Sequence, residues 1–339
     1  MSGWASMTCA LVKLWSRFPI RLHLGLGSMD RSDFLPHSDT LFSALGNAFL
    51  LLYGEKELLE FLDGLQISSV FPGIRLGERD LLFFPVPLSV VHAANSSDLL
   101  LRKKVKRVRF ASLEAFRAVM GGFNPQKHAF VVNLLDEKRF ALWNSQYLVT
   151  RSEMDLLQDE AIRIGMALEP HVTVHRQDNR SQDLYFEEDA WVHGSSSVRP
   201  FLFFLVSGGG AFLEPVLRLF IEEGLGGERF QGKGRFDAFE TEPFELPQEG
   251  KYLILLSLAK PRREEMSHLL VYDLIRRGGF IFRGEPLGVR KRTLYKLVEG
   301  SVVRLPFVGE NVDVSPFAGQ PVISYGKALG FAVPGEGVG

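Results

Sequence analysis

Short segments in which apolar and polar residues alternate recur along the whole chain. The earliest clear one is 20–24, where the apolar positions alternate with Arg21 and His23. A period of two predicts a β-strand. The same pattern, or a short apolar run, predicts strands at 67–72, 81–85, 130–135, 172–176, 184–186, 201–206, 252–258, 302–304, 312–314 and 322–325.

The segment 38–53 has a helical period instead. Ser38 is its predicted N-cap and Gly54 its predicted end. Its predicted buried stripe consists of Leu41, Leu45, Phe49 and Leu52. Residues 56–62 and 212–223 predict two further helices. Both halves therefore mix strands with a few helices, which predicts an α+β fold, and the initial β–α–β–β order is typical of ferredoxin-like folds.

Composition limits the classes of function. The formal net charge is −1, so any contact with nucleic acid must come from local patches. A single cysteine, Cys9, excludes an internal disulfide and a cysteine-based zinc cluster and suits a reducing cytosol. Because no apolar run reaches membrane-spanning length, we expect a soluble, cytoplasmic protein, and nothing in the sequence calls for a metal or a cofactor.

The segment 224–235 is rich in glycine and cations. It holds five glycines together with Arg229, Lys233 and Arg235, and backbone amides beside cations can bind an anion such as a phosphate. Gly224 has a structural explanation as the end of the preceding helix. The segment follows a helix and lacks Gly-Lys-Ser/Thr, which argues against a dinucleotide fingerprint and a Walker A loop.

A basic strip at 102–109 contains six cations and no acid. Two interpretations remain open, a solvated basic face and a contact with a phosphodiester backbone. The strip contributes Lys104, Lys106 and Arg107 as candidate RNA-binding residues.

Several motifs follow one another in a characteristic order. They occupy 23–25, 36–45, 68–72, 82–87, 174–180, 184–186, 224–234, 312–316 and 321–327. Together they resemble subunit four of the type III-A (Csm) CRISPR interference complex, a member of the RAMP superfamily, over residues 20–330. Gln320 and Ser324 depart from the family pattern, which often has His and Arg there.

The resemblance implies two ferredoxin-like domains in tandem, 8–150 and 151–335, with the seam within 136–171. Residues 136–170 are mixed and mostly polar, and from this composition we expect a protruding hairpin or lobe there. The resemblance also implies a cap on the 5′ handle of the CRISPR RNA that contacts the large polymerase-domain subunit and the first backbone RAMP subunit, and target RNA only indirectly.

Residues with suitable chemistry for the handle lie in the motifs, the basic strip and the Gly-rich segment. The predicted RNA-binding residues are His23, Lys104, Lys106, Arg107, His175, Arg176, Arg180, Gly226, Gly227, Arg229, Lys233 and Arg235. The amino end of the 38–53 helix offers further unpaired amides, although Asp39 opposes an anion there and is expected to cap the helix.

Two other functions stay open. An endoribonuclease that processes CRISPR RNA could use His37 as a general base beside Asp39, but no second acid or nucleophile arrangement accompanies the pair, so we predict no catalytic site. A purely structural bridging subunit would use the glycines for folding and partner contact alone.

Overall fold

The computed structural model describes residues 6–25, 32–88, 90–92, 106–124, 126–132, 136, 138–157, 162–175, 177, 180–195, 198–281, 289–317 and 321–333. Its helices are α1 (Ser38–Tyr53), α2 (Leu58–Gly64), α4 (Leu113–Met120), α5 (Arg151–Leu157) and α6 (Leu213–Glu223), with 3₁₀ turns η1 (Gly210–Phe212), η2 (Arg229–Gln231) and η3 (Arg263–His268). The strands of the first half are β1 (Ser6–Trp15), β2 (Ile20–Leu22), β3 (Gln66–Ile67), β4 (Phe71–Leu76), β5 (Arg79–Pro85), β6 (Val90–His92), β7 (Phe110–Ser112), β8 (Phe123–Asn124), β9 (Ala129–Val132), β10 (Phe140–Trp143) and β11 (Tyr147–Thr150). Those of the second half are β12 (Arg163–Val174), β13 (Ser181–His193), β14 (Val198–Ser207), β15 (Ala238–Pro247), β16 (Tyr252–Leu255), β17 (Leu269–Val271), β18 (Leu274–Arg277), β19 (Phe280–Ile281), β20 (Val289–Arg290), β21 (Leu294–Leu297), β22 (Val302–Arg304), β23 (Val312–Asp313), β24 (Ile323–Ser324) and β25 (Gly330–Val333).

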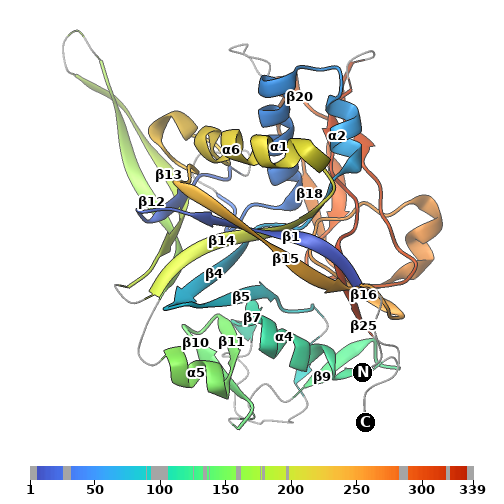
Figure 1. Cartoon of the computed structure of the whole chain (residues 1–339). Coiled ribbons are helices and arrows are strands. Elements are labelled where there is room, and N and C mark those ends of the chain that lie inside the picture. The colour runs from blue at the N-terminus through green and yellow to red at the C-terminus, as the bar shows by residue number, and fades with distance from the viewer. Residues whose placement is uncertain are drawn as a thin grey trace.

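A large sheet forms the centre of the molecule, and its strand order is β10-β11-β7-β5-β4-β14-β1-β15, with β3 paired to β14. The strands β15, β1, β14 and β4 are antiparallel neighbours. Together with α1 and α6 they follow one another as β-α-β-β-α-β, and Figure 1 shows both helices on one face of these strands. The fold is thus a mixed one of helices and strands.

The elements β1, α1, β4, β14, α6 and β15 form one β-α-β-β-α-β unit. The predicted boundary between residues 150 and 151 falls inside this unit. β1 lies before that boundary, whereas its two neighbours β14 and β15 lie after it. After β15, which ends at Pro247, the chain enters a further, four-stranded sheet. That four-stranded sheet has the order β17-β22-β16-β25.

Helix α1 confirms most of its predicted pattern. Leu41, Leu45 and Phe49 are fully buried, and Gly54 ends the helix with φ +77°. Leu52 is 44% exposed, so its prediction as a buried residue is wrong. The whole last turn, residues 50–53, is exposed, because the helix extends beyond the layer on which it packs.

Ser38 does not cap α1 with its side chain. The N-cap position is His37, whose side chain accepts no capping hydrogen bond. The Ser38 hydroxyl accepts the amide hydrogen of Leu258 at 3.0 Å, and the Ser38 amide donates to the Ser69 hydroxyl at 2.8 Å. These bonds join the start of α1 to segments that are far away in the sequence, which local capping rules do not consider.

The protruding element is the hairpin of β12 and β13, which projects from the molecule in Figure 1. The sequence predicted it at 136–170, but the first part of that range forms β10, β11 and α5. Both β10 and β11 belong to the large sheet. The mixed polarity of 136–157 arose from strands at the edge of that sheet and not from a free lobe.

Candidate nucleic-acid interface

The Gly-rich loop, residues 224–235, leaves α6 and closes on itself. Gly224 has φ +83°, and its amide donates to the Phe220 carbonyl, which confirms the predicted end of the helix. The Leu225 amide donates to the Gly234 carbonyl at 2.9 Å. One hydrogen bond therefore joins the two ends of the loop.

Two more backbone hydrogen bonds attach the loop to the chain at the end of β2. The Gly234 amide donates to the Arg21 carbonyl at 2.7 Å, and the Gly227 amide donates to the His23 carbonyl at 2.8 Å. Only glycine fits this contact at Gly226, because its φ is +96° and a Cβ there would lie 2.5 Å from the His23 carbonyl oxygen.

Besides that of Gly224, several amides of the Gly-rich loop are used inside the protein. Five of them donate to backbone carbonyls, namely those of Leu225, Gly227, Gln231, Gly232 and Gly234. An amide hydrogen that is already shared is not available to a phosphate oxygen. Part of the backbone that was predicted to hold a phosphate is therefore engaged within the protein.

Lys233 lies in a buried ion cluster beneath the loop. Its side chain is 2% exposed, and its Nζ lies 2.9 Å from Asp189 and also contacts Glu187. Arg21 and His23 reach Asp189 as well, His23 Nδ1 at 3.2 Å. Burial favours a higher pKa for Asp189, but hydrogen bonds from Lys233 and Arg21 lower this pKa below its usual value. Lys233, which was predicted to bind RNA, is therefore enclosed and paired with carboxylates of the protein itself.

The same cluster resembles a metal site in its geometry alone. His23, Glu187 and Asp189 place potential ligand atoms within 4.8 Å of one another. The Lys233 ammonium already contacts both carboxylates and supplies the positive charge that a metal ion would bring. We interpret the cluster as an ion-pair network that holds the loop against β2 and β13.

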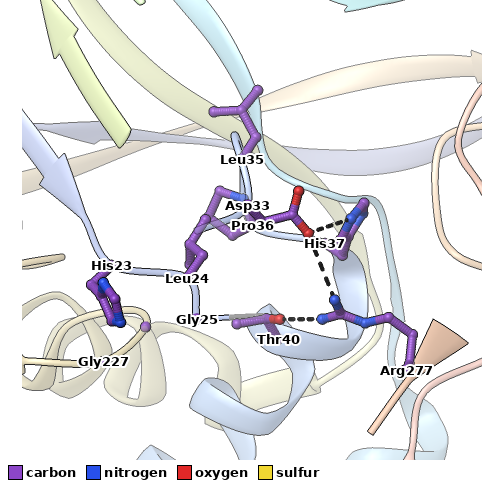
Figure 2. A pocket seen from close by; sticks show the side chains of 11 residues that line it. His23, Leu24, Gly25, Asp33, Leu35, Pro36, His37, Thr40, Gly227 and Arg277 are labelled. Atoms are coloured by element: carbon purple, nitrogen blue, oxygen red, sulfur yellow. Dashed lines mark hydrogen bonds and ion pairs between the residues drawn. The ribbon is translucent and has the colours of Figure 1, made fainter. Parts of the chain in front are cut away.

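A cavity of about 120 Å³ lies beside the Gly-rich loop. Figure 2 shows His23 and Gly227 on one side of it and His37 and Arg277 on the other, with Asp33, Pro36 and Thr40 between them. Pockets that enclose whole ligands usually measure about 300–1,000 Å³, so this cavity suits one group of a longer chain. The fold thus joins the loop, the end of β2 and the amino end of α1, which the sequence had presented separately.

Arg277 connects the cavity wall to α1. Its guanidinium donates two hydrogen bonds to Asp39, at 3.0 and 2.8 Å, and one to the Thr40 hydroxyl at 2.9 Å. The buried Lys296 donates to the same carboxylate at 3.0 Å. Burial favours a higher pKa for Asp39, but the charges of Lys296 and Arg277 hold it far below the usual value. Asp39 therefore pairs with distant cations, which corrects its predicted role as a helix cap.

His37 lies between two carboxylates at the start of α1. Its Nε2 is 3.0 Å from Asp33 and its Nδ1 is 2.8 Å from Glu299. Burial lowers the pKa of His37, but the charge of Glu299 and the contacts with Asp33 outweigh this effect and raise the pKa to about 10. The ring is then an imidazolium at neutral pH, and it cannot accept a proton as a general base while these contacts hold.

Other predicted RNA-binding residues lie on the surface around this region. Arg235 is exposed and lines a second cavity, of about 430 Å³, together with Arg21. Arg229 lies 3.9 Å from Glu223, a distance at which an exposed ion pair contributes little. These two arginines are thus the cations of the Gly-rich loop that an external ligand can reach.

The basic strip and the hairpin tip hold the remaining predicted residues. Lys106 and Arg107 are exposed just before β7. The guanidinium carbon of the nearby Arg109 lies 4.9 Å from the ring centroid of Phe34. Phe34 is next in sequence to Asp33 and Leu35, which line the cavity. His175 and Arg180 meet at the tip of the β12–β13 hairpin, joined by a backbone hydrogen bond of 2.9 Å. Lys104 and Arg176 lie outside the described residues.

Sequence reasoning missed the partners that fix the site. Arg277 belongs to a basic doublet, but its contact with Asp39 spans 238 positions, and spacing rules do not reach so far. Glu187 and Asp189 alternate along β13 and are both fully buried. Acids at positions i and i+2 of a strand point to the same face. In a strand that also carries buried apolar residues, such a pair indicates that a cation lies inside the protein beside it.

Comparisons with known proteins agree over almost the whole chain. The family model described as the CRISPR Csm4 C-terminal domain matches residues 248–333. The Csm4 protein of Methanocaldococcus jannaschii is 24% identical over 345 residues, covering 90% of this chain and 89% of that protein. The Csm4 protein of Mycobacterium tuberculosis (strain H37Rv) is 27% identical over 332 residues, covering 93% and 95%.

Solved structures share the fold. A chain of the Csm3–Csm4 subcomplex of a type III-A CRISPR-Cas interference complex matches with a TM-score of 0.62 and 20% identity, over 94% of this chain and 98% of that chain. A chain of a Csm1–Csm4 cassette in complex with cA4 matches with a TM-score of 0.54 and 21% identity, over 96% and 98%. Among the described residues, no helix is both long and apolar enough to cross a membrane.

Proposed function

Because this chain belongs to the Csm4 family of type III CRISPR subunits, we propose that it binds the 5′ repeat-derived handle of the CRISPR RNA in a type III-A complex and catalyses no reaction itself. The observation that carries this proposal is the convergence of the Gly-rich loop, the end of β2 and the start of α1 around one cavity. RNA recognition commonly engages single strands through phosphates, 2′-hydroxyls and unstacked bases, and a small cavity with a guanidinium in its wall suits one such group.

The distribution of charge supports an RNA track rather than a cofactor site. Arg229 and Arg235 on the loop, and Lys106 and Arg107 before β7, are cations that solvent reaches. On a chain with net charge −1 they form the local patches that phosphate binding requires. Lys233 has a different role in this proposal: it holds the loop in place from below.

The proposal includes partners and architecture. One solved relative is paired with Csm3 and another with Csm1. We propose that this chain likewise links the large polymerase-domain subunit to the backbone subunits and meets target RNA only indirectly, in the cytoplasm. We propose that the β-α-β-β-α-β unit, whose bounds differ from the expected 8–150, is one ferredoxin-like domain, and that the sheet of β16, β17, β22 and β25 belongs to a second.

Reversing the two accessible cations of the loop tests the proposal. In the assembled complex, we expect Arg229→Glu with Arg235→Glu to weaken protection of the handle against ribonuclease by roughly tenfold, because two phosphate contacts become repulsive. The matched control is Arg79→Glu with Arg218→Glu, which changes the charge equally at exposed ion pairs. Lys233 is left intact, since its reversal would bury an unpaired charge.

Two outcomes contradict this function. Unchanged protection of the handle in the loop variant would leave a purely bridging role. Metal-independent cleavage of repeat RNA by the purified chain, lost in His37→Ala, would favour an endoribonuclease instead.

A further inference from the structure

The basic ribbon is a two-stranded extension formed by residues 274–281 and 289–297. Within it β18 pairs with β21 and β19 pairs with β20, both antiparallel. These residues include no Asp or Glu and six cations, Arg276, Arg277, Arg290, Lys291, Arg292 and Lys296. A chain that is almost neutral overall thus concentrates positive charge on one narrow element.

The inner face of the ribbon is attached to α1. Residues opposite each other in an antiparallel pair share a face, and Ile275 lies opposite Lys296 as Arg277 lies opposite Leu294. Arg277 and Lys296 both bind Asp39, and Figure 1 shows β18 and β20 beside α1. Because Arg277 also lines the cavity, the ribbon begins at the wall of the proposed RNA site.

The exposed side of the ribbon, called its outer face, is defined by two pairs in which a cation lies opposite an aromatic ring. Arg276 lies opposite Tyr295, and Arg290 lies opposite Phe280, with its guanidinium carbon 5.1 Å from the centroid of that ring. Tyr295 is 59% and Phe280 58% exposed. Among the residues that the structure describes, no carboxylate forms an ion pair with Arg276 or Arg290.

We propose that this outer face binds single-stranded RNA that continues from the cavity, with Arg276 and Arg290 on phosphates and with bases stacked on Phe280 and Tyr295. The inference rests on the proposed function, because the strand it extends is the one held at the cavity. Cations that follow the backbone beside exposed aromatic rings are the combination by which proteins hold single strands. A duplex keeps its bases stacked inside and offers no face to these rings.

A set of ribbon variants tests the inference by salt titration. Binding of a short single-stranded polyuridylate RNA to the purified full chain is measured against salt concentration. We expect Arg276→Glu with Arg290→Glu to weaken binding roughly tenfold or more and to reduce the slope of log K against log salt by about 1.4, since each lost phosphate contact on a single strand removes about 0.7. Phe280→Ala with Tyr295→Ala should weaken binding about tenfold or more with an unchanged slope, because stacking releases no counterions.

Controls separate this surface from the cavity and from a protein interface. Arg79→Glu with Arg218→Glu should leave binding unchanged. If Arg229→Glu with Arg235→Glu weakens binding and neither ribbon variant does, the ribbon inference is overturned and the proposed function stands. If no variant weakens binding, both fail. Normal RNA binding together with lost assembly into the complex would identify the ribbon as a protein contact and also overturn the inference.

Discussion

Asp39 is the residue on which the position of α1 depends most. It is buried between Arg277 and Lys296, and both of these cations come from the basic ribbon. Lys296 is fully buried and also donates to the Ser324 hydroxyl and the Tyr325 carbonyl. A carboxylate in such a position holds two segments together because its removal would leave buried positive charge without a partner.

The substitution Asp39→Asn measures this dependence. We expect a loss of about 3–5 kcal/mol in the free energy of unfolding, since one partner of a buried ion pair is removed. The control is Asp63→Asn, at an ion pair with Lys327 in which the Asp63 side chain is 79% exposed. That change should cost about 1 kcal/mol or less. Urea unfolding followed by tryptophan fluorescence compares the two, and equal losses would contradict the role given to Asp39.

His37 gives stability a defined pH dependence. Its pKa rises from 6.5 to about 10 in the folded protein. A raised histidine pKa contributes stability that is fully present below pH 6.5 and is lost as the pH rises towards 10. The difference in unfolding free energy between the wild type and His37→Gln should therefore shrink across this window, by an amount on the order of a few kcal/mol.

The exposed His193 provides the matched substitution. His193→Gln should differ from the wild type by a small amount that changes little over the same range. A His37→Gln difference that stays constant between pH 6.5 and 10 would show that the imidazolium is not formed as described.

At the scale of elements, local sequence signals predicted where the Gly-rich loop begins but not which distant residues its amides bind. The helix that precedes it was predicted at 212–223, and its end at Gly224 was predicted from glycine chemistry. The attachment of the Gly227 and Gly234 amides was not, because their acceptors, the carbonyls of His23 and Arg21, lie about 200 positions earlier in the chain. The same limit explains Ser38, whose hydroxyl binds Leu258 and not its own helix.

Substitutions at two glycines of the loop distinguish the cost of a steric clash from the cost of a positive φ. A Cβ on Gly234 would lie 1.9 Å from the Leu225 carbonyl oxygen, whereas a Cβ on Gly232 would meet nothing within 4 Å, and both have positive φ. We expect Gly232→Ala to cost about 1–2 kcal/mol of unfolding free energy. Gly234→Ala should cost roughly 1–3 kcal/mol more because of the clash. Chemical denaturation with limited proteolysis of the loop checks this, and equal effects would mean that the loop does not close at Leu225.

At the scale of the whole molecule, the class of fold was predictable, whereas the pairing of distant strands was not. Alternating segments predicted some strands of the large sheet and the four-stranded sheet, among them β5, β14, β16 and β22, but they missed β1 and β15. Strand β1 pairs with strands near residues 200 and 240, and the long insertion between β4 and β14 conceals that pairing. The matched Csm4 C-terminal domain begins at residue 248, directly after β15 completes the large sheet. Pairing across such distances depends on tertiary contacts, which single-sequence patterns do not encode.

The candidate site was predictable to the same degree. The glycines of the loop, His23 and the start of α1 were identified from their residue types, and the fold places them around one cavity. The enclosure of Lys233 and the pairing of Arg277 with Asp39 arise only when distant charges meet. Prediction therefore found the surfaces of the site but not the buried ion pairs that hold them.

The most direct test of the account is nucleotide-resolved photo-crosslinking of guide RNA in the assembled complex, with the crosslinked peptides identified by mass spectrometry. The account predicts that handle nucleotides crosslink to this chain, at peptides from the Gly-rich loop and from residues 23–40 around the cavity. Crosslinks from every handle nucleotide to other subunits alone, with none to this chain, would contradict it.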